Sequence, residues 1–395
     1  MNFNVGIAEL SSALQRALPV IPPKSTLPVL EHLHLSLKGN VLEIVATDQD
    51  ITILSRLPVE GGEDGEVLAP ARKFSDIIKA LGSEGTISFS VNPENLTVEI
   101  KSRRGSYKMK GLPSMEYLEL PELFETAMPE IDQIAGVEPD KNYGVFKAGE
   151  LSRLAQKTVF AVSGDEYRIA MTGVLMQFRG NQAIAVATDS FRLVKAVTNA
   201  ENNIFPTEFD VILPSRAIDL MKRIDSEVTI SAIDASGKVT HMRFDTENMT
   251  IISRIIDEKY PPYQSVIPSN NDKSATLDIA EFLKAIKRVS IFANVTTKQI
   301  KLTFENSSCT LVGEDEESGN KATEQINCDY AGETMTVGFN YKFLEDALHN
   351  ISQEDTTDNL VEMLFSTATK PVLLVPKNEK NELLMLIMPV RLASE

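Results

Sequence analysis

The fold of this chain is decided by a passage that occurs twice and returns once more in weaker form. Residues 68–81 read LAPARKFSDIIKAL, and residues 213–224 read LPSRAIDLMKRI. In both, an apolar run meets a proline and continues into a helix-forming segment. Residues 335–348, MTVGFNYKFLEDAL, also pass from an apolar run into a helix-forming segment, but without the proline. Self-similarity of this kind indicates repeated structural units, so the rest of the chain is best interpreted by comparing it with itself.

A second motif repeats together with the first. Ala46-Thr47-Asp48 precedes the first copy of the strand-to-helix passage, and Ala187-Thr188-Asp189 precedes the second copy. Each repeated helix also has an amphipathic partner about sixty residues earlier, with apolar residues at helical spacing. We therefore predict helices in six segments, residues 6–20, 70–82, 147–163, 214–224, 279–294 and 340–351. Alternating runs such as residues 32–37 and 86–91 lie between them and are typical of antiparallel hairpins. Two helices with many strands in each unit predict an α+β fold, with the helices on one face of the sheet.

The length of 395 residues is two or three times that of a usual domain. Polar, proline-containing stretches interrupt the chain near residues 128–140 and 268–274. We therefore predict three similar domains, with bounds 1–128, 129–268 and 269–395.

The composition is that of a folded protein, with 43% hydrophobic and 24% charged residues. Only two cysteines occur, Cys309 and Cys328, which excludes a disulfide scaffold and suits a reducing compartment. The first residues show no basic segment followed by an apolar run. These features predict a cytoplasmic protein.

The net charge of −17 argues at first against a polyanionic partner. The charge is unevenly distributed, however. Segments 70–82, 147–163, 214–224 and 279–294 each carry +2, segment 6–20 carries 0 and segment 340–351 carries −1. The helices together therefore carry +7, and the rest of the chain carries −24. Basic helices with no tryptophan can contact phosphates but are poorly equipped to distinguish bases, so the pattern favours sequence-independent contact with duplex DNA.

Two copies of the chain are large enough to form a ring around a DNA duplex. Helices pack roughly 10 Å apart, so twelve helices from two chains would span roughly 120 Å of arc and leave an opening of roughly 28 Å. A DNA duplex would pass through such an opening. One chain alone could form only half of the ring.

Six motifs, in the same order along the chain, resemble those of the bacterial DNA polymerase III beta subunit family, the processivity sliding clamps. They are Thr26-Leu27-Pro28-Val29-Leu30, Pro70-Ala71-Arg72-Lys73-Phe74, Ala187-Thr188-Asp189-Ser190-Phe191-Arg192-Leu193, Tyr260-Pro261-Pro262-Tyr263, Val337-Gly338-Phe339-Asn340 and Met388-Pro389-Val390-Arg391-Leu392. The resemblance covers essentially the whole chain. It implies the DNA clamp fold, a head-to-tail homodimeric ring with helices inside and antiparallel sheets outside, and a role that is not enzymatic.

The resemblance also implies partners and sites. The partners would be duplex DNA, the replicative polymerase alpha subunit, the clamp loader complex, and other replication and repair proteins that carry clamp-binding motifs. A peptide-binding cleft between the second and third domains would involve Met171, Thr188, Ser190, Phe191, Arg192, Leu193, Pro261, Val266, Leu386, Met388, Pro389, Val390, Arg391 and Leu392. The apolar strand at residues 383–388 supports this, because adaptable methionines suit varied partners.

The remaining implied sites are basic or lie at a chain-to-chain contact. Contacts with DNA would come from Lys24, Arg72, Arg103, Arg104, Lys222 and Lys287. The dimer interface would use Tyr107, Met109, Ile291 and Phe292. An edge strand that carries apolar residues needs a partner, and a second copy supplies one.

Three features depart from the family pattern. Ser190-Phe191 stands where the family has Gly-His, and Val390 stands where a methionine is frequent. Ala393-Ser394-Glu395 extend past the usual last leucine. We expect these changes to alter the preference of the cleft for its peptides.

Two other classes of function stay open. An enzyme or metalloprotein could use His32 and His34, yet only two further histidines occur, and Asp48 and Asp189 recur as turn-capping residues would. No cofactor, metal or catalytic residue is therefore predicted. No phosphate-binding Gly-Lys-Ser/Thr loop occurs, so loading onto DNA must depend on a separate ATPase. A peptide-binding scaffold without DNA contact is the other alternative.

Overall fold

The structure is a computed structural model that describes residues 1–118, 143–198, 204–235, 238–352, 359–377 and 382–392. Every segment predicted to be helical contains a helix. The α-helices are α1 (Ile7–Ala17), α2 (Ala71–Ala80), α3 (Glu150–Thr158), α4 (Ser215–Met221), α5 (Ile279–Val289) and α6 (Tyr341–Ile351). Short 3-10 turns add η1 (Leu18–Val20), η2 (Pro28–Glu31), η3 (Ser114–Glu116), η6 (Val159–Ala161), η7 (Ile169–Thr172), η8 (Tyr263–Val266) and η9 (Ser290–Phe292).

The chain forms two compact units, residues 1–145 with 226–255 and residues 146–225 with 256–395. This division runs through the middle third of the chain, because some of its strands join the sheet of the first third and others join the sheet of the last third. The predicted domain bounds stay a prediction, and the first of them, at residues 128 and 129, lies outside the described residues.

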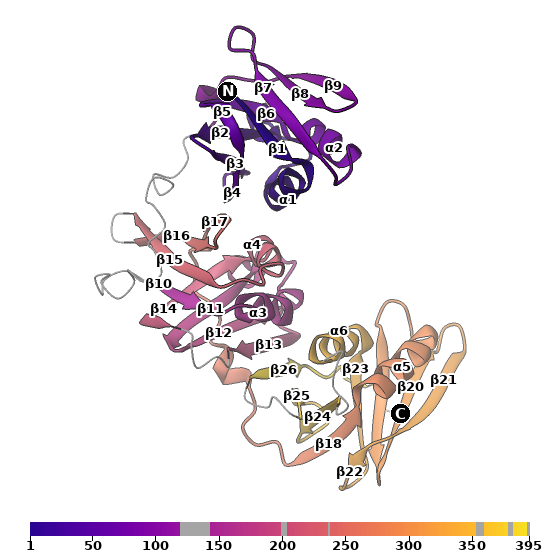
Figure 1. The fold of residues 1–395 in the computed structure, drawn as a ribbon. Helices are drawn as coiled ribbons and strands as arrows, with labels where there is room; N and C mark the ends of the chain where they lie inside the picture. The colour runs from indigo at the N-terminus through magenta and orange to yellow at the C-terminus, as the bar shows by residue number, and fades with distance from the viewer. Residues whose placement is uncertain (119–142, 199–203, 236–237, 353–358, 378–381, 393–395) are drawn as a thin grey trace. The chain divides into compact units, whose positions relative to one another are not determined.

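The first unit holds two antiparallel sheets (Figure 1). The five-stranded sheet runs in the order β5 (Glu60–Glu63), β1 (Asn2–Gly6), β7 (Thr86–Val91), β8 (Thr97–Ser102) and β9 (Gly105–Lys110). The eight-stranded sheet runs β10 (Tyr143–Phe146), β15 (Val228–Ala235), β16 (Lys238–Asp245), β17 (Met249–Arg254), β4 (Ile51–Pro58), β3 (Val41–Thr47), β2 (His32–Lys38) and β6 (Gly65–Pro70). The pairing of β17 with β4 makes this sheet continuous between the first and middle thirds of the chain.

The second unit is built in the same way (Figure 1). Its nine-stranded sheet runs β14 (Phe205–Pro214), β11 (Gly173–Gly180), β12 (Gln182–Thr188), β13 (Arg192–Val197), β26 (Leu383–Ile387), β25 (Val372–Pro376), β24 (Leu360–Phe365), β18 (Lys273–Asp278) and β22 (Asp329–Tyr330). Its four-stranded sheet runs β21 (Asn320–Asn327), β20 (Ser308–Asp315), β19 (Gln299–Glu305) and β23 (Met335–Asn340). Here β13 and β26 form the joint.

The helices repeat as regularly as the strands. α1 contacts α2, α3 contacts α4 and α5 contacts α6. α1 packs on β3 and β4, α3 packs on β12 and β13, and α5 packs on β20 and β21. In α5, for example, Phe282, Ala285, Ile286 and Val289 are buried, and the side chain of Asp278 caps the helix by accepting a hydrogen bond from Glu281 N at 2.8 Å. The predicted α+β arrangement, with helices on one face of each sheet, is confirmed.

One backbone contact occurs at the same place in all three repeats and aligns them residue by residue. Leu68 and Leu112 exchange hydrogen bonds at 3.0 Å, Ile256 N donates to Ile212 O at 2.8 Å, and Val390 N donates to Gly338 O at 2.8 Å. In each case a segment that follows the last strand of the repeat returns to the strand that leads into its second helix. Positions in the three repeats can therefore be compared directly.

No helix in the described ranges is both long enough and apolar enough to cross a membrane.

Candidate functional site

The Thr-Asp motif forms the same turn in two repeats. In the first copy, Asp48 Oδ1 accepts hydrogen bonds from Asp50 N at 3.1 Å and Ile51 N at 2.8 Å. In the second copy, Asp189 Oδ1 accepts from the backbone N of the corresponding residues, Phe191 and Arg192, at 2.9 Å each. The residue after the aspartate has a positive φ in both, 85° at Gln49 and 78° at Ser190. The aspartates cap turns, as predicted.

The second of these turns lies where the middle and last thirds of the chain join. β13 pairs with β26 so that Arg192 faces Ile387 and Leu193 faces Leu386. Just beyond the strand, Met388 N donates to Phe191 O at 2.8 Å. The turn and the C-terminal tail, which are far apart in sequence, thus become neighbours at one site.

An apolar floor lies beneath this junction. Its buried residues are Leu175, Val186, Leu193, Ile212, Tyr263, Leu373 and Leu386. Tyr260 and Ile267 pack against it, and the Tyr260 hydroxyl donates to Val186 O at 3.2 Å. Burial raises the pKa of Tyr260 well above its ordinary value, so the hydroxyl stays protonated and keeps this bond.

The predicted cleft residues take different positions around this floor. Phe191 is 62% exposed, Val266 is 50% exposed and Met388 is 36% exposed, so these three present apolar surface to solvent. Met171, Thr188, Leu193 and Leu386 are buried. Pro261, Pro389, Val390 and Leu392 are partly exposed, whereas Ser190 and Arg391 are exposed. Arg192 differs from the rest, because its side chain is only 13% exposed and is held by other groups of the protein.

Sequence reasoning missed the segment before Met171. Tyr167 and Ile169 are exposed, and their neighbour Arg168 donates from Nη1 to Ser190 Oγ at 2.6 Å. This bond attaches the segment to the turn. The signal that could have revealed it is a tyrosine and an isoleucine within the short polar stretch that precedes Met171.

The corresponding junction between the first and middle thirds has the same backbone and different chemistry. The aligned registers place His34 where Leu175 stands, Glu43 where Ile184 stands and Arg243 where Leu373 stands. Polar contacts fill this first junction, including Arg56 Nε to Glu43 Oε1 at 3.1 Å and Arg243 Nε to Asp245 Oδ2 at 2.7 Å. Of the two junctions among the described residues, the second is therefore the one with an apolar floor.

The residues predicted to contact DNA lie in both units. Lys24, Arg72, Arg103, Arg104 and Lys287 are exposed. Arg72 is in the first turn of α2, Lys287 is on α5, and Arg103 and Arg104 form the turn between β8 and β9. Lys222 follows α4, is partly exposed and forms an ion pair with Asp219 at 2.7 Å. Lys73 and Lys79 on α2 and Lys284 on α5 add further exposed cations.

The predicted dimer residues lie at two sheet edges. Tyr107 and Met109 are partly exposed on one face of β9, which ends the five-stranded sheet. Ile291 is 77% exposed and Phe292 is 41% exposed in η9, which packs beside β20 and β21. β21 ends the four-stranded sheet. One pair of apolar residues thus lies on the edge strand β9, and the other lies beside the edge strand β21.

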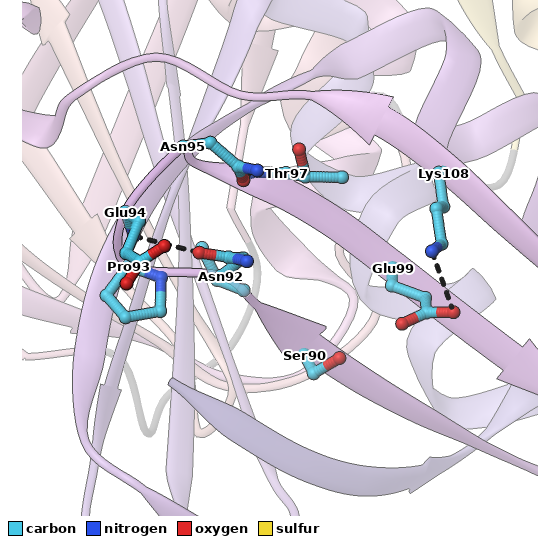
Figure 2. Close-up of a pocket in the computed structure, with 9 residues that line it drawn as sticks. Ser90, Asn92, Pro93, Glu94, Asn95, Thr97, Glu99 and Lys108 are labelled. Carbon is cyan, nitrogen blue, oxygen red and sulfur yellow. Dashed lines mark hydrogen bonds and ion pairs between the residues drawn. The ribbon is translucent and has the colours of Figure 1, made fainter.

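A hollow of about 670 Å³ lies at the turn between β7 and β8, lined by residues 90–95 with Thr97, Glu99 and Lys108 (Figure 2). Its polar groups are already engaged with one another. Ser106 Oγ donates to Glu99 Oε1 at 2.7 Å, and Lys108 Nζ lies 3.7 Å from the same oxygen. The bond from Ser106 lowers the pKa of Glu99, and the charges of Lys101 and Lys108 add to the effect. Among the described residues, no three His, Cys, Asp or Glu side chains gather as they would to hold a metal ion.

Three consecutive family models match this chain. The N-terminal, central and C-terminal domains of the DNA polymerase III beta subunit match residues 1–121, 146–262 and 264–391. Curated relatives include the beta sliding clamps of Pseudomonas aeruginosa and Bacillus subtilis, each 27% identical over 99% of this chain and 100% of the relative.

Solved structures agree. A DNA polymerase sliding clamp from Pseudomonas aeruginosa superposes with a TM-score of 0.85 at 25% identity, over 99% of this chain and 100% of that one. Another structure from the same species, a sliding clamp bound to griselimycin, has a TM-score of 0.86 at 25% identity with the same coverage.

Proposed function

Because this chain belongs to the DNA polymerase III beta subunit family and is therefore a processivity factor of DNA polymerase rather than an enzyme, we propose that two copies close head to tail around duplex DNA. The ring would consist of six domains, with bounds 1–128, 129–268 and 269–395 in each chain. The basic helices would line its inside and the sheets its outside. The protein would act in the cytoplasm, together with the polymerase that it serves.

The observation that carries this proposal is the number of strands in the four sheets. Each of the two large sheets joins the first half of one repeat to the second half of the next, through β4 with β17 and through β13 with β26. The four- and five-stranded sheets are the two halves left over, and each ends in a free strand, β21 or β9. Pairing β21 with β9 of a second copy would complete a third joint of the same kind, and doing so twice closes a ring.

The aligned repeats also predict the register of this third joint. In the two internal joints, Ile251 faces Ile53 and Met385 faces Val194. The corresponding residues at the free edges are Tyr107 and Ala322. A bulky ring opposite a small side chain packs well on one face of an antiparallel pair. The exposed side chains of Ile291 and Phe292 lie beside β21 and would be covered by the incoming strand.

Charge complementarity supports the same joint. The β8–β9 hairpin, residues 97–110, carries a net charge of +4, and the β20–β21 hairpin, residues 308–327, carries −4. Opposite charges on two edges favour the head-to-tail pairing, whereas two like edges repel each other. The joint should therefore weaken as salt concentration rises.

The basic helices support contact with the phosphate backbone of duplex DNA. Their exposed lysines and arginines can neutralise phosphates without distinguishing bases, which permits sliding. The implied contacts are Lys24, Arg72, Arg103, Arg104, Lys222 and Lys287. A scaffold that never touches DNA would need none of them.

The second junction would hold the partner proteins, namely the polymerase alpha subunit, the clamp loader complex and other proteins with clamp-binding segments. Its apolar floor, with Phe191, Val266 and Met388 exposed above it, suits a short peptide with apolar side chains. Griselimycin, which the Pseudomonas aeruginosa clamp binds, should also bind this chain.

A charge exchange tests the ring closure. One variant carries Arg103→Glu, Arg104→Glu and Lys110→Glu, which change the net charge of the β8–β9 hairpin from +4 to −2. The other carries Glu316→Lys, Glu317→Lys and Glu324→Lys, which change the net charge of the β20–β21 hairpin from −4 to +2. Each variant alone should sediment as a monomer, because it pairs like charges at both joints. An equimolar mixture should form dimers, because the altered edges then meet each other and the unaltered edges meet each other.

Dimers of either variant alone, or a mixture that stays monomeric, would contradict the head-to-tail joint. Ile204→Asp serves as a control, since it places a charge on an exposed apolar residue far along the chain from both hairpins. It should leave the wild-type dimer unchanged.

A further inference from the structure

Arg192 is the most heavily engaged cation at the second junction. Its Nε donates to Asp189 Oδ2 at 3.0 Å, its Nη1 donates to Asp346 Oδ2 at 2.5 Å, and its Nη2 donates to Phe160 O at 2.7 Å. All three nitrogens of the guanidinium therefore have a partner within the protein. Such a planar fork cannot be replaced by a lysine, which offers a single point charge.

Two aromatic rings hold the same guanidinium. Its central carbon lies 5.3 Å from the centroid of the Phe160 ring and 4.9 Å from that of Phe343. Phe160 belongs to η6, in the middle third of the chain, and Phe343 belongs to α6, in the last third. Arg192 thus joins the turn, η6 and α6 at one point.

This arrangement belongs to one junction only among those the structure describes. The residue that corresponds to Arg192 in the first junction is Ile51, which is buried and follows the same aspartate-capped turn. A buried isoleucine is thus enough to support this type of turn. The arginine occurs at the junction that has the apolar floor. This placement indicates that the arginine serves the binding of a ligand at that junction.

The adjacent residue connects Arg192 to the exposed surface. The Phe191 ring stacks on Phe343, with centroids 6.3 Å apart and 21° between the planes. Phe343 therefore lies against both Phe191 and the guanidinium. The backbone carbonyl of Phe191 also receives the hydrogen bond from Met388 N. Any movement of the Arg192 side chain would shift the support of Phe191 and of the tail.

We propose that Arg192 is a positioning residue of the peptide cleft, which fixes Phe191 and the Met388 tail for the ligand and does not itself contact the bound peptide. The inference rests on the proposed function of the second junction. It assigns Phe191 as the apolar side chain that the peptide packs against. The side chain is only 13% exposed and each of its three nitrogens already donates within the protein, so a bound peptide has little access to it.

The proposal makes a specific prediction about energetic coupling. Arg192→Lys should weaken peptide binding about tenfold, because one ammonium cannot replace three bonds and two ring contacts. Asp346→Asn should weaken binding in the same direction, because it loosens the anchor on α6. If Arg192 instead bound the peptide directly, Asp346→Asn would leave binding unchanged or strengthen it by freeing the guanidinium.

A double-mutant cycle with Phe191 separates positioning from contact. The probe is a fluorescent peptide that copies the clamp-binding segment of the host's polymerase alpha subunit, and its affinity for the full-length protein is measured by anisotropy. In a Phe191→Ala background, Arg192→Lys should cause a clearly smaller loss, because only its effect on the Met388 tail remains. An equal loss in both backgrounds would overturn the proposal.

A matched control removes the effect of general loosening. Arg153 Nη2 donates to Val197 O at 2.6 Å and to Glu382 Oε2 at 3.2 Å, so it too links the strands of the second unit, away from Phe191. Arg153→Lys should lower the melting temperature about as much as Arg192→Lys and leave peptide affinity unchanged. If Arg153→Lys and Arg192→Lys lost equal peptide affinity, Arg192 would be a structural residue only, and the proposal would be wrong. Failure of the wild-type protein to bind the peptide would contradict the proposed function itself.

The chain has no tryptophan, so Phe191→Trp gives a single reporter that needs no peptide. Adding Arg192→Lys should shift its emission to the red as the ring leaves Phe343. An unchanged spectrum would contradict the proposal independently of any binding data.

Discussion

Gly338 shows how one position without a side chain fixes the C-terminal tail. A Cβ added there would lie 2.7 Å from Leu392 Cδ2 and 2.8 Å from Val390 O. The tail reaches this position because Val390 N donates to Gly338 O. We expect Gly338→Ala to cost about 1–3 kcal/mol locally, to displace the tail and to weaken peptide binding without unfolding β23.

Anisotropy with the same peptide, together with a thermal melt, checks this prediction. Gly164→Ala is the matched control, because a Cβ at Gly164 meets no atom within 4 Å. Wild-type affinity in Gly338→Ala would show that the tail is not part of the cleft.

Residues differ in how far the sequence could reveal their roles. The capping role of Asp48 and Asp189 was predictable, because the turn is local and occurs twice. The contacts of Arg192 were not, because its acceptors Phe160 O and Asp346 are 32 and 154 residues away along the chain. The resemblance placed Arg192 in the cleft, and the structure shows its guanidinium held by the protein.

At the level of elements, α2 is one of the helices suited to contact phosphates. Arg72, Lys73 and Lys79 are all exposed on its ten residues. Reversing the three to glutamate should weaken retention on DNA. The slope of log affinity against log salt concentration should also become shallower, because up to about three phosphate contacts are lost.

Three exposed lysines outside the helices provide the control. Lys38→Glu, Lys259→Glu and Lys370→Glu together change the net charge by the same amount. They should leave DNA retention near the wild-type level. Equal losses in the two triple variants, measured by filter binding over a salt series, would mean that total charge rather than the helix determines binding.

The elements themselves were largely predictable, and their partners were not. Helical periodicity and the strand-to-helix passages located every α-helix to within a few residues, because these signals are local. The pairing of β4 with β17 and of β13 with β26 joins strands nearly two hundred residues apart. Nothing in the hydrophobic pattern of either strand specifies such a partner, so the two-unit division of the chain could not be foreseen.

For the whole molecule, the acidic net charge and the DNA-binding role are compatible because charge is segregated. The predicted helical segments together carry +7 within a chain of net charge −17. A closed ring would stay on DNA because it is topologically linked to the duplex. The contacts between its inner surface and the phosphates can therefore be weak, which allows the ring to slide. The four- and five-stranded half-sheets are the structural basis for that closure.

Retention on circular and on linear DNA tests this linkage most directly. The host's clamp loader first loads the protein onto a nicked circular plasmid, and moderate salt is then added. Half of the sample is cut once with a restriction enzyme, and both halves are analysed by gel filtration. We predict that the protein stays with the circle and is lost from the linear molecule through its ends. Equal retention on both forms, or equal loss from both, would contradict a ring that encircles the duplex.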